Sequence, residues 1–175
     1  MSTFPALPPS RQTDPVPTVR ELTDVDDGWR LTTLEAGWGS TCVARLGELI
    51  DAAELPGFVA ELEGRRVGLV TVVVRPDGIE VATLQALTEG RGVGRSLMDR
   101  VRGLAIEVGA PRMWLITTND NIRAFAFYQR WGMDLVQVVH DGVSASRRVK
   151  PTIPEIGSSG IACRHEIELE LRLRG

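Results

Sequence analysis

One stretch of the chain, Leu84–Arg100 (LQALTEGRGVGRSLMDR), constrains the fold more than any other. An apolar strand stops there, a glycine-rich loop follows, and a helix begins. Glycine lets the backbone approach a ligand closely and adopt a positive φ, and the first turn of a helix leaves N–H groups unpaired with a partial positive charge. Arg91 and Arg95 add two full charges, so the stretch predicts a site for a phosphate-bearing ligand. The glycines stand at alternate positions: Gly90, Gly92 and Gly94.

Two phosphate-binding motifs are absent from this loop. The dinucleotide fingerprint G-x-G-x-x-G would require a glycine where Arg95 stands, and the Walker A motif G-x-x-x-x-G-K-[ST] does not occur in the chain. Two interpretations stay open on these residues alone. The loop is either a phosphate site of another type or a glycine-rich connection that binds nothing.

Composition and charge limit the class of protein and its partners. A chain of 175 residues, 43% of them apolar, suits one domain with a buried core. The net charge of −3 provides no basic field, so we expect no nucleic-acid partner. Cys42 and Cys163 lack metal-ligand spacing, so we expect no metal site. No apolar run reaches about 18 residues and no signal-peptide pattern is present, so we expect a cytoplasmic protein that does not span a membrane.

Hydrophobic periodicity divides the chain into a tail and one domain. Met1–Pro17 is proline-rich and predicts a disordered tail, which leaves a single domain over 18–175. A helix is expected from Thr23 or Asp24 to about Ala36, and a helical turn at Gly47–Ala53. Three strands in series, joined by short turns, predict an antiparallel meander: Phe58–Glu63, Val67–Arg75 and Ile79–Leu87.

In the second half of the chain, helices and strands alternate. An apolar stripe after the glycine loop predicts a helix that buries Val93, Leu97, Val101, Leu104 and Val108. The strand that follows should pair in parallel with Ile79–Leu87. The remaining expected elements are the strand Met113–Thr117, the helix Asn121–Trp131, the strand Met133–His140, the short helix Ser144–Lys150, the loop Pro151–Gly160, and the edge strand Glu166–Arg172 with one solvated face.

The helix at Asn121 carries a second candidate site. Asn121, Ala124 and Tyr128 share one face because they stand at i, i+3 and i+7. Taken alone, that face also fits an ordinary amphipathic helix whose tyrosine packs with its hydroxyl at the rim.

The whole segment TTNDNIRAFAFYQRWGM resembles a motif of the GCN5-related N-acetyltransferases, the GNAT family, in which a strand is followed by Asn-x-x-Ala-x-x-Phe-Tyr-x-x-x-Gly-Phe. Met133 stands in place of the final Phe. The loop G-R-G-V-G resembles the pyrophosphate loop of the same family. The resemblance covers Val19–His140, and the tail PTIPEIGSSGIACRHEIELEL resembles a bacterial subgroup known mainly from genome sequences. The matching positions are Asn121, Ala124, Phe127, Tyr128 and Gly132.

The resemblance implies a fold and an activity. The fold would be α/β (α+β), with a mixed central sheet of about six to seven strands, an N-terminal antiparallel meander and about four helices. Two parallel strands would splay apart to form a notch for coenzyme A. The activity would be N-acetylation, in which a primary amine of a small molecule, amino acid or protein attacks acetyl-CoA directly in a ternary complex.

The resemblance also implies roles for particular residues. The backbone N–H groups of Arg91–Arg95 would bind the pyrophosphate, which includes Gly92, Val93 and Gly94. The pantetheine arm would pair with Ala86 and Leu87, whose N–H groups would also hold the oxyanion. Asn121 would contact the arm or brace the notch, and Ala124 would leave room for the cosubstrate. Tyr128 would donate a proton or a hydrogen bond to the departing thiolate.

Two carboxylates, Glu89 and Glu80, stand at positions that have counterparts in the family. Glu89 stands where the family usually has Arg or Gln, and a carboxylate facing pyrophosphate is unfavourable, so we expect Glu89 to point to solvent. Glu80 stands where several family members carry a general base, and it would act through a water. The alternative is a solvated Glu at a strand start. His140 and His165 are weaker candidates for the base.

The acceptor and the assembly are less constrained. We expect the acceptor amine to be bound by Glu35–Arg45 and by Pro151–Gly160, where Trp38 and Glu155 permit an apolar or cationic molecule. The strand Glu166–Arg172 would offer an edge to a second copy in a homodimer. Two other functions compete: a non-catalytic acyl-CoA-binding module on the same fold, and a toxin that modifies aminoacyl-tRNA, which the net charge disfavours.

Overall fold

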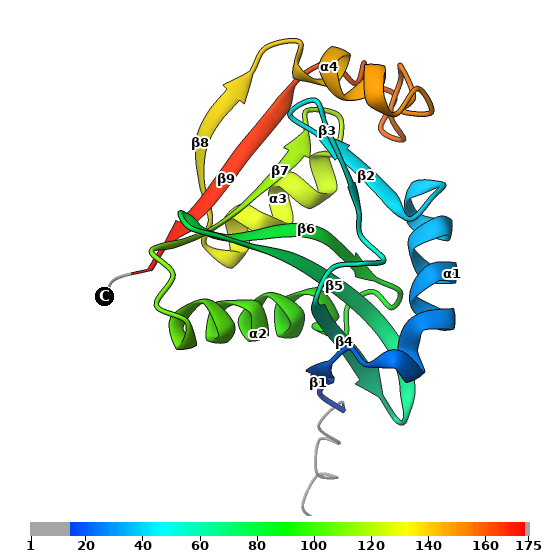
Figure 1. Ribbon diagram of the computed structural model, residues 1–175, viewed down its shortest axis with the longest axis vertical. Coiled ribbons are helices and arrows are strands. Elements are labelled where there is room, and N and C mark those ends of the chain that lie inside the picture. Colours follow the sequence, from blue (N-terminus) through cyan, green and yellow to red (C-terminus); the bar gives the residue numbers. More distant parts are fainter. Residues whose placement is uncertain (1–14, 174–175) are drawn as a thin grey trace, which may run out of the picture.

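A seven-stranded mixed sheet organises the protein, as seen in a computed structural model that describes residues 15–173 (Figure 1). The strand order is β1-β4-β5-β6-β7-β9-β8, and β2 and β3 form a separate hairpin. The strands are β1 (Thr18–Glu21), β2 (Cys42–Arg45), β3 (Glu48–Asp51), β4 (Gly57–Leu62), β5 (Arg65–Arg75), β6 (Gly78–Ala86), β7 (Arg112–Thr118), β8 (Asp134–Val139) and β9 (Glu166–Arg172). The helices are α1 (Asp27–Trp38), α2 (Val93–Glu107), α3 (Ile122–Trp131) and α4 (Gly142–Val149), and a 3-10 turn, Asp24–Asp26, precedes α1.

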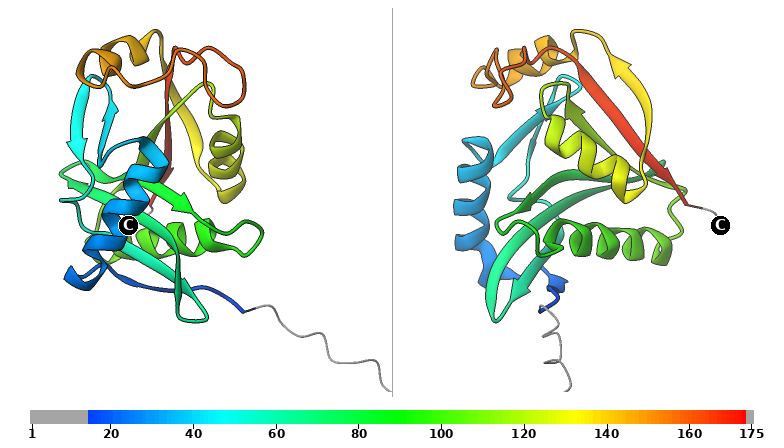
Figure 2. Two further views of the ribbon diagram at one scale, coloured as in Figure 1. Left: turned by 90° about the vertical axis from the view of Figure 1, so that its right-hand side faces the viewer. Right: turned by 180° about the vertical axis from the view of Figure 1, so that it is seen from behind.

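The predicted meander is confirmed as β4, β5 and β6, which pair antiparallel in series. Successive side chains of β5 alternate between the two faces of the sheet. Leu69 packs in the cluster that includes Leu34 of α1, whereas Val70 packs in the larger cluster with Leu97 of α2 and Tyr128 of α3. The helices therefore cover opposite faces, α1 on one side and α2 with α3 on the other (Figure 2). Of the predicted stripe on α2, Val93, Leu97 and Val101 are buried, but Val108 follows the helix and is exposed.

The parallel pair β6–β7 is also confirmed, and it is short. Only Ile79 with Met113 and Glu80 with Trp114 are in register. Beyond Glu80, β6 continues to Ala86 and β7 continues to Thr118 without pairing to each other, as Figure 1 shows. The sheet is therefore split between β6 and β7, at the end of β6 that leads into the glycine loop.

The helical turn expected at Gly47–Ala53 is wrong, because these residues form strand β3 and its exit. β3 pairs with β2, with Cys42 opposite Asp51. The reversal occurs at Leu46 and Gly47, whose φ angles are 51° and 74°. Two successive positive φ angles make a tight hairpin turn. The sequence hides this turn because leucine rarely adopts a positive φ.

The edge position expected for Glu166–Arg172 is wrong as well. This segment is β9, and it lies inside the sheet between β7 and β8. Its alternating glutamates are not solvated: Glu166 and Glu170 are buried. The outer strand at this end is β8, so a homodimer through β9 is excluded by the pairing. The homodimer itself stays a prediction.

The proline-rich tail predicted over Met1–Pro17 lies outside the described residues except for 15–17, which have no regular secondary structure. Within the described part of the chain, no helix is long and apolar enough to cross a membrane. The same residues hold no group of three or more His, Cys, Asp or Glu side chains that could bind a metal ion.

Candidate active site

The glycine loop ends at Gly92, which is the N-cap of α2. Gly90 and Gly92 have φ angles of 71° and 72°, so both occupy the left-handed region that favours glycine. The first helical hydrogen bond onto the cap is from Ser96 N–H to the carbonyl of Gly92. The N–H groups of Val93, Gly94 and Arg95 therefore precede the helical ladder, as the predicted pyrophosphate site requires.

Gly94 has a further structural reason to be glycine. A Cβ added there would lie 3.2 Å from Cζ of Phe127 on α3. The close approach of α2 and α3 therefore depends on Gly94, which indicates that only part of the glycine pattern concerns a ligand.

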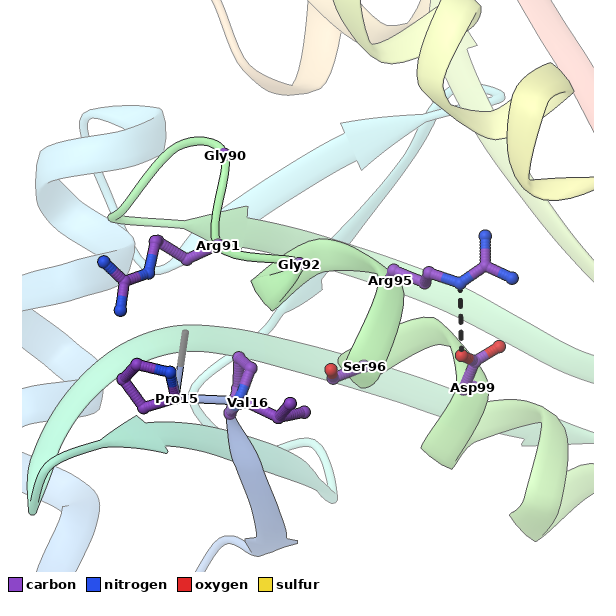
Figure 3. Close-up of a pocket in the computed structure, with 9 residues that line it drawn as sticks. Pro15, Val16, Gly90, Arg91, Gly92, Arg95, Ser96 and Asp99 are labelled. Atoms are coloured by element: carbon purple, nitrogen blue, oxygen red, sulfur yellow. Dashed lines mark ion pairs between the residues drawn. The ribbon is translucent and has the colours of Figure 1, made fainter. Parts of the chain in front are cut away.

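The two loop arginines extend to opposite sides of the first turn of α2 (Figure 3). With Pro15, Val16 and Ser96 they line a cavity of about 430 Å³. Arg95 is 70% exposed and lies 3.8 Å from Asp99. The Arg91 Nε is buried and has no hydrogen-bond partner among residues 15–173. Both guanidinium groups thus retain donors that an anion can occupy.

Glu89 is exposed, as expected, and it has a partner. Its Oε1 lies 2.6 Å from Nη2 of Arg123, in the first turn of α3. Both side chains are largely exposed, so the ion pair contributes little stability. Its effect is local, because it places the negative charge of Glu89 beside a cation.

A second cavity of about 510 Å³ lies where β6 and β7 diverge. It brings together four of the predicted site residues, Glu80, Asn121, Ala124 and Tyr128. Two of its walls are the diverging strands β6 and β7, and a third is α3. The hairpin residues Val43–Arg45 and the end of α1, at Gly37 and Trp38, form another side. The segment after α4 completes the lining with Lys150, Thr152, Ile153, Pro154, Ser158 and Cys163. Ala86, Leu87 and the glycine loop do not line this cavity, so the predicted residues form two groups.

Tyr128 projects from α3 into the split of the sheet. Its side chain is 8% exposed, and the Phe127 ring packs edge-on at 5.3 Å between ring centroids. Burial raises the pKa of the Tyr128 hydroxyl well above its usual range because the phenolate would be poorly solvated. The hydroxyl is therefore protonated at neutral pH and can serve as a hydrogen-bond or proton donor.

Asn121 caps α3, since its Oδ1 accepts a hydrogen bond from Ala124 N–H at 3.3 Å. This bond fixes the side chain at the wall of the cavity, in line with the bracing role proposed from the sequence.

At the end of β6 the N–H groups of Ala86 and Leu87 have different surroundings, which the sequence could not distinguish. Leu87 N–H donates to the carbonyl of Val67 at 2.8 Å, so it is occupied by β5. Successive N–H groups of a strand point in opposite directions. Ala86 N–H therefore points away from β5, on the side where β6 has no partner strand.

Glu80 is 1% exposed, which excludes the alternative of a solvated glutamate. Arg45 binds both of its oxygens, with Nε to Oε1 at 2.5 Å and Nη2 to Oε2 at 2.8 Å. Arg75 Nε adds a bond to Oε2 at 2.7 Å. A water or amine would compete with two guanidinium groups for the lone pairs of Glu80. The role of Glu80 as a general base stays a prediction. His140 and His165 do not line the cavity; their rings pack against each other at 5.0 Å.

Sequence reasoning missed several polar residues of the cavity, among them Lys150, Asp120 and Cys163. Lys150 Nζ donates to the carbonyls of Trp38 at 2.8 Å and Cys42 at 2.6 Å, and burial lowers its pKa. Asp120 and Cys163 are both buried. Asp120 precedes Asn121, the residue that caps α3. No spacing rule links Cys163 to Asp120, because they meet through the loop that follows α4.

Comparisons with known proteins agree with this geometry. A profile of the Acetyltransferase (GNAT) family matches residues 24–133, more than half of the chain. YdhI of Bacillus subtilis, a protein described as uncharacterized, is 37% identical over 131 residues, which are 74% of this chain and 82% of YdhI.

Solved structures show the same fold. An IAA acetyltransferase from Bacillus cereus has a TM-score of 0.68 and 21% identity, over 90% of this chain and 99% of that one. A GNAT family acetyltransferase from Elizabethkingia anophelis, solved with acetyl-CoA bound, has a TM-score of 0.64 and 16% identity, over 93% and 100%. The chain belongs to the GNAT family of acetyltransferases.

Proposed function

We propose that the protein transfers an acetyl group from acetyl-CoA to a primary amine by direct attack in a ternary complex. The observation that carries the proposal is the position of Tyr128, a buried and protonated phenol that lines the cavity where β6 and β7 separate. A module that only binds acyl-CoA would not need a proton donor there.

Residues of the chain fit the cosubstrate in two places. The N–H groups of Val93–Arg95 precede the helical ladder and suit a pyrophosphate. Arg91 Nε, which has no hydrogen-bond partner within residues 15–173, can donate to the same anion. The unpaired edge of β6 at Ala86 suits an extended amide-bearing arm. The acetyl-CoA seen in the Elizabethkingia relative supports this choice of ligand.

Acetyl-CoA supplies the acetyl group as an activated thioester. Ala86 N–H donates a hydrogen bond to the carbonyl oxygen as negative charge develops on it during attack by the amine. Tyr128 donates a hydrogen bond or its proton to the sulfur as the carbon–sulfur bond breaks. Burial raises the pKa of Tyr128 further above the ordinary thiol value of about 8.5, so the phenol is protonated when the carbon–sulfur bond breaks and its hydrogen bond stabilises the departing thiolate.

The amine must lose a proton before it attacks. Glu80 remains the proposed acceptor of that proton through a water. Its ion pairs with Arg45 and Arg75 hold the carboxylate in one position. The pair with Arg45 also holds β2 against β6, so Glu80 shapes the wall of the cavity irrespective of any role as a base.

The acceptor is proposed to enter between the end of α1, the β2–β3 hairpin and the loop after α4. Trp38, Thr152, Ile153, Pro154 and Ser158 line the cavity there, whereas Glu155 does not. The acceptor class is a small molecule, an amino acid or a peptide amine.

The experiment is a screen of the purified protein with acetyl-CoA and pooled amines, followed by mass spectrometry. The expected result is an acetylated amine together with free CoA thiol. Tight CoA binding with no acetylated product from any pool would replace the proposal with the non-catalytic acyl-CoA-binding module.

A further inference from the structure

The buried carboxylates of residues 15–173 differ in whether their oxygens have hydrogen-bond partners. Four of them receive hydrogen bonds from cationic or polar groups of the chain, whereas Oδ1 of Asp120 is buried and has no hydrogen-bond partner within the described residues. Leaving an ionised carboxylate buried and unpaired is expensive in free energy. The paired examples are Asp26 with Arg20 and Arg66, Glu80 with Arg45 and Arg75, Glu166 with Ser146, and Glu170 with Arg112.

Asp120 is held in place by packing. It stands between β7 and α3 and is 8% exposed. Gly157, in the loop after α4, presses so closely on the carboxylate that a Cβ added to it would collide with Oδ2 of Asp120. The loop that forms one wall of the cavity therefore fixes the orientation of this side chain.

Asp120 lies beside a helix N-terminus and beside a buried thiol. It immediately precedes the N-terminus of α3, and its carbonyl accepts the Ile122 N–H at 2.9 Å, so the positive end of the helix is close. The neighbouring thiol of Cys163 is protonated, because burial and the Asp120 carboxylate raise its pKa to about 11. A thiol is a weak donor and leaves the negative charge uncompensated.

The cations near this wall are engaged elsewhere. Arg147 donates to the carbonyls of Ile153, Pro154 and Cys163. Lys150 donates to the carbonyls of Trp38 and Cys42. Among residues 15–173 no Lys, Arg or His forms an ion pair with Asp120, so this part of the chain supplies no countercharge to its carboxylate.

We infer that Asp120 binds a cationic ammonium group of the acceptor, in the cavity that Tyr128 also lines. The inference rests on the proposed function and narrows it: the acceptor is an amine that enters as a cation, and one without a carboxylate close to its amino group. An acidic amino acid would bring its own negative charge to a wall that already carries an unpaired one.

The first test needs no ligand. Asp120→Asn keeps the shape and removes the charge, so the melting temperature of the free protein should rise. Asp134→Asn, at an exposed position of β8, is the matched control and should leave it unchanged. A lower melting temperature in Asp120→Asn would show that the carboxylate has a stabilising partner, and an unchanged one would show that Asp120 is already neutral; both contradict the inference.

The second test measures binding without turnover. The CoA-saturated protein is titrated by calorimetry with spermidine, agmatine and tyramine, and with glutamate as the acidic amine. At least one of the three cationic amines should bind, glutamate should not, and Asp120→Asn should weaken that binding about 10- to 100-fold, the worth of a hydrogen bond to a charged group. Affinity for CoA should be the same in both proteins.

Different results would contradict the proposed function and the role of Asp120. Loss of CoA binding in the wild type contradicts the proposed function. Normal CoA binding with no bound cationic amine, or with equal amine affinity in Asp120→Asn and wild type, contradicts the role of Asp120 alone.

Discussion

Glu80 and Asp120 are two buried carboxylates on one cavity, and their partners give them opposite energetic characters. Glu80 accepts three hydrogen bonds from Arg45 and Arg75, while one oxygen of Asp120 accepts none within residues 15–173. Removing the charge of Glu80 leaves the buried Arg45 with only the exposed Glu48 as a carboxylate partner, whereas removing an unpaired buried charge stabilises the folded protein. The sign of the change in stability therefore distinguishes a residue kept for the fold from one kept for a ligand.

Glu80→Gln is expected to destabilise the protein by about 3–5 kcal/mol, the usual result of breaking a buried ion pair. Glu48→Gln is the control, since Glu48 binds the same Arg45 but is 63% exposed, and its loss should be worth less than about 1 kcal/mol. Urea unfolding of the two variants measures the difference. Equal destabilisation by both would show that the burial of Glu80 has little energetic weight.

The elements around the site depend on close contacts that follow from particular residues. The hydrophobic stripe of α2, the meander and the Asn121–Tyr128 face could all be predicted, because each depends on local periodicity. The β2–β3 hairpin and the interior place of β9 could not. Glu166 and Ser146 hold the hairpin tip at the positive φ of Leu46: Glu166 Oε2 accepts Leu46 N–H at 2.9 Å, and Ser146 Oγ accepts Gly47 N–H at 3.2 Å.

The same tertiary partners explain the misplacement of β9. Its alternating glutamates are typical of a solvated face, but Arg112 binds Glu168 and Glu170 at 2.7 and 3.0 Å, and Ser146 binds Glu166 at 2.6 Å. Charge pairing that reaches across the sheet has no signature in one strand. Asp120 escaped prediction for the same reason, since its lack of a partner becomes visible only once the loop after α4 is placed.

Gly68→Ala tests the contact between β5 and α2. A Cβ at this position would collide with Cγ1 of Val93 and lie 3.0 Å from Cδ1 of Leu97, so α2 must move away from the sheet. We expect a loss of about 1–3 kcal/mol of stability, typical of overpacking, together with weaker CoA binding because Val93 begins the helix whose N–H groups bind the pyrophosphate.

Gly103→Ala in the middle of α2 is the matched control. Its added Cβ would meet only ordinary van der Waals contacts, at 3.7 and 4.0 Å. This variant should gain about 0.4–1 kcal/mol and bind CoA normally. If calorimetry finds the same CoA affinity in Gly68→Ala as in Gly103→Ala, the position of α2 does not control the site.

At the scale of the whole molecule, a buried ion-pair network ties the N-terminal elements to the sheet. Asp26 is fully buried and binds Arg20 of β1 at 2.7 and 2.9 Å and Arg66 of β5 at 2.7 Å. Arg20 also binds Glu61 of β4 at 2.7 Å. The hydrogen bond from Arg20 is the main cause that holds the pKa of Asp26 far below its usual range.

This depressed pKa predicts a pH dependence of stability. A carboxylate whose pKa is lower in the folded state stabilises the protein at pH values above its unfolded pKa, about 3.9, and the contribution is lost as pH falls below that value. The difference in unfolding free energy between the wild type and Asp26→Asn should therefore be constant near neutral pH and shrink below about pH 4. Urea titrations at several pH values measure it. A difference that does not change with acidification would contradict the assigned network.

The most direct test of the central claim is the turnover number of Tyr128→Phe at saturating acetyl-CoA, measured on an amine that the wild type acetylates. The variant keeps the ring and removes the proton donor, so turnover should fall about 10²- to 10⁴-fold while the affinity for acetyl-CoA stays the same. Because burial raises the pKa of Tyr128, the wild type should also show no loss of activity from its ionisation up to about pH 10. Wild-type turnover in Tyr128→Phe would contradict the account.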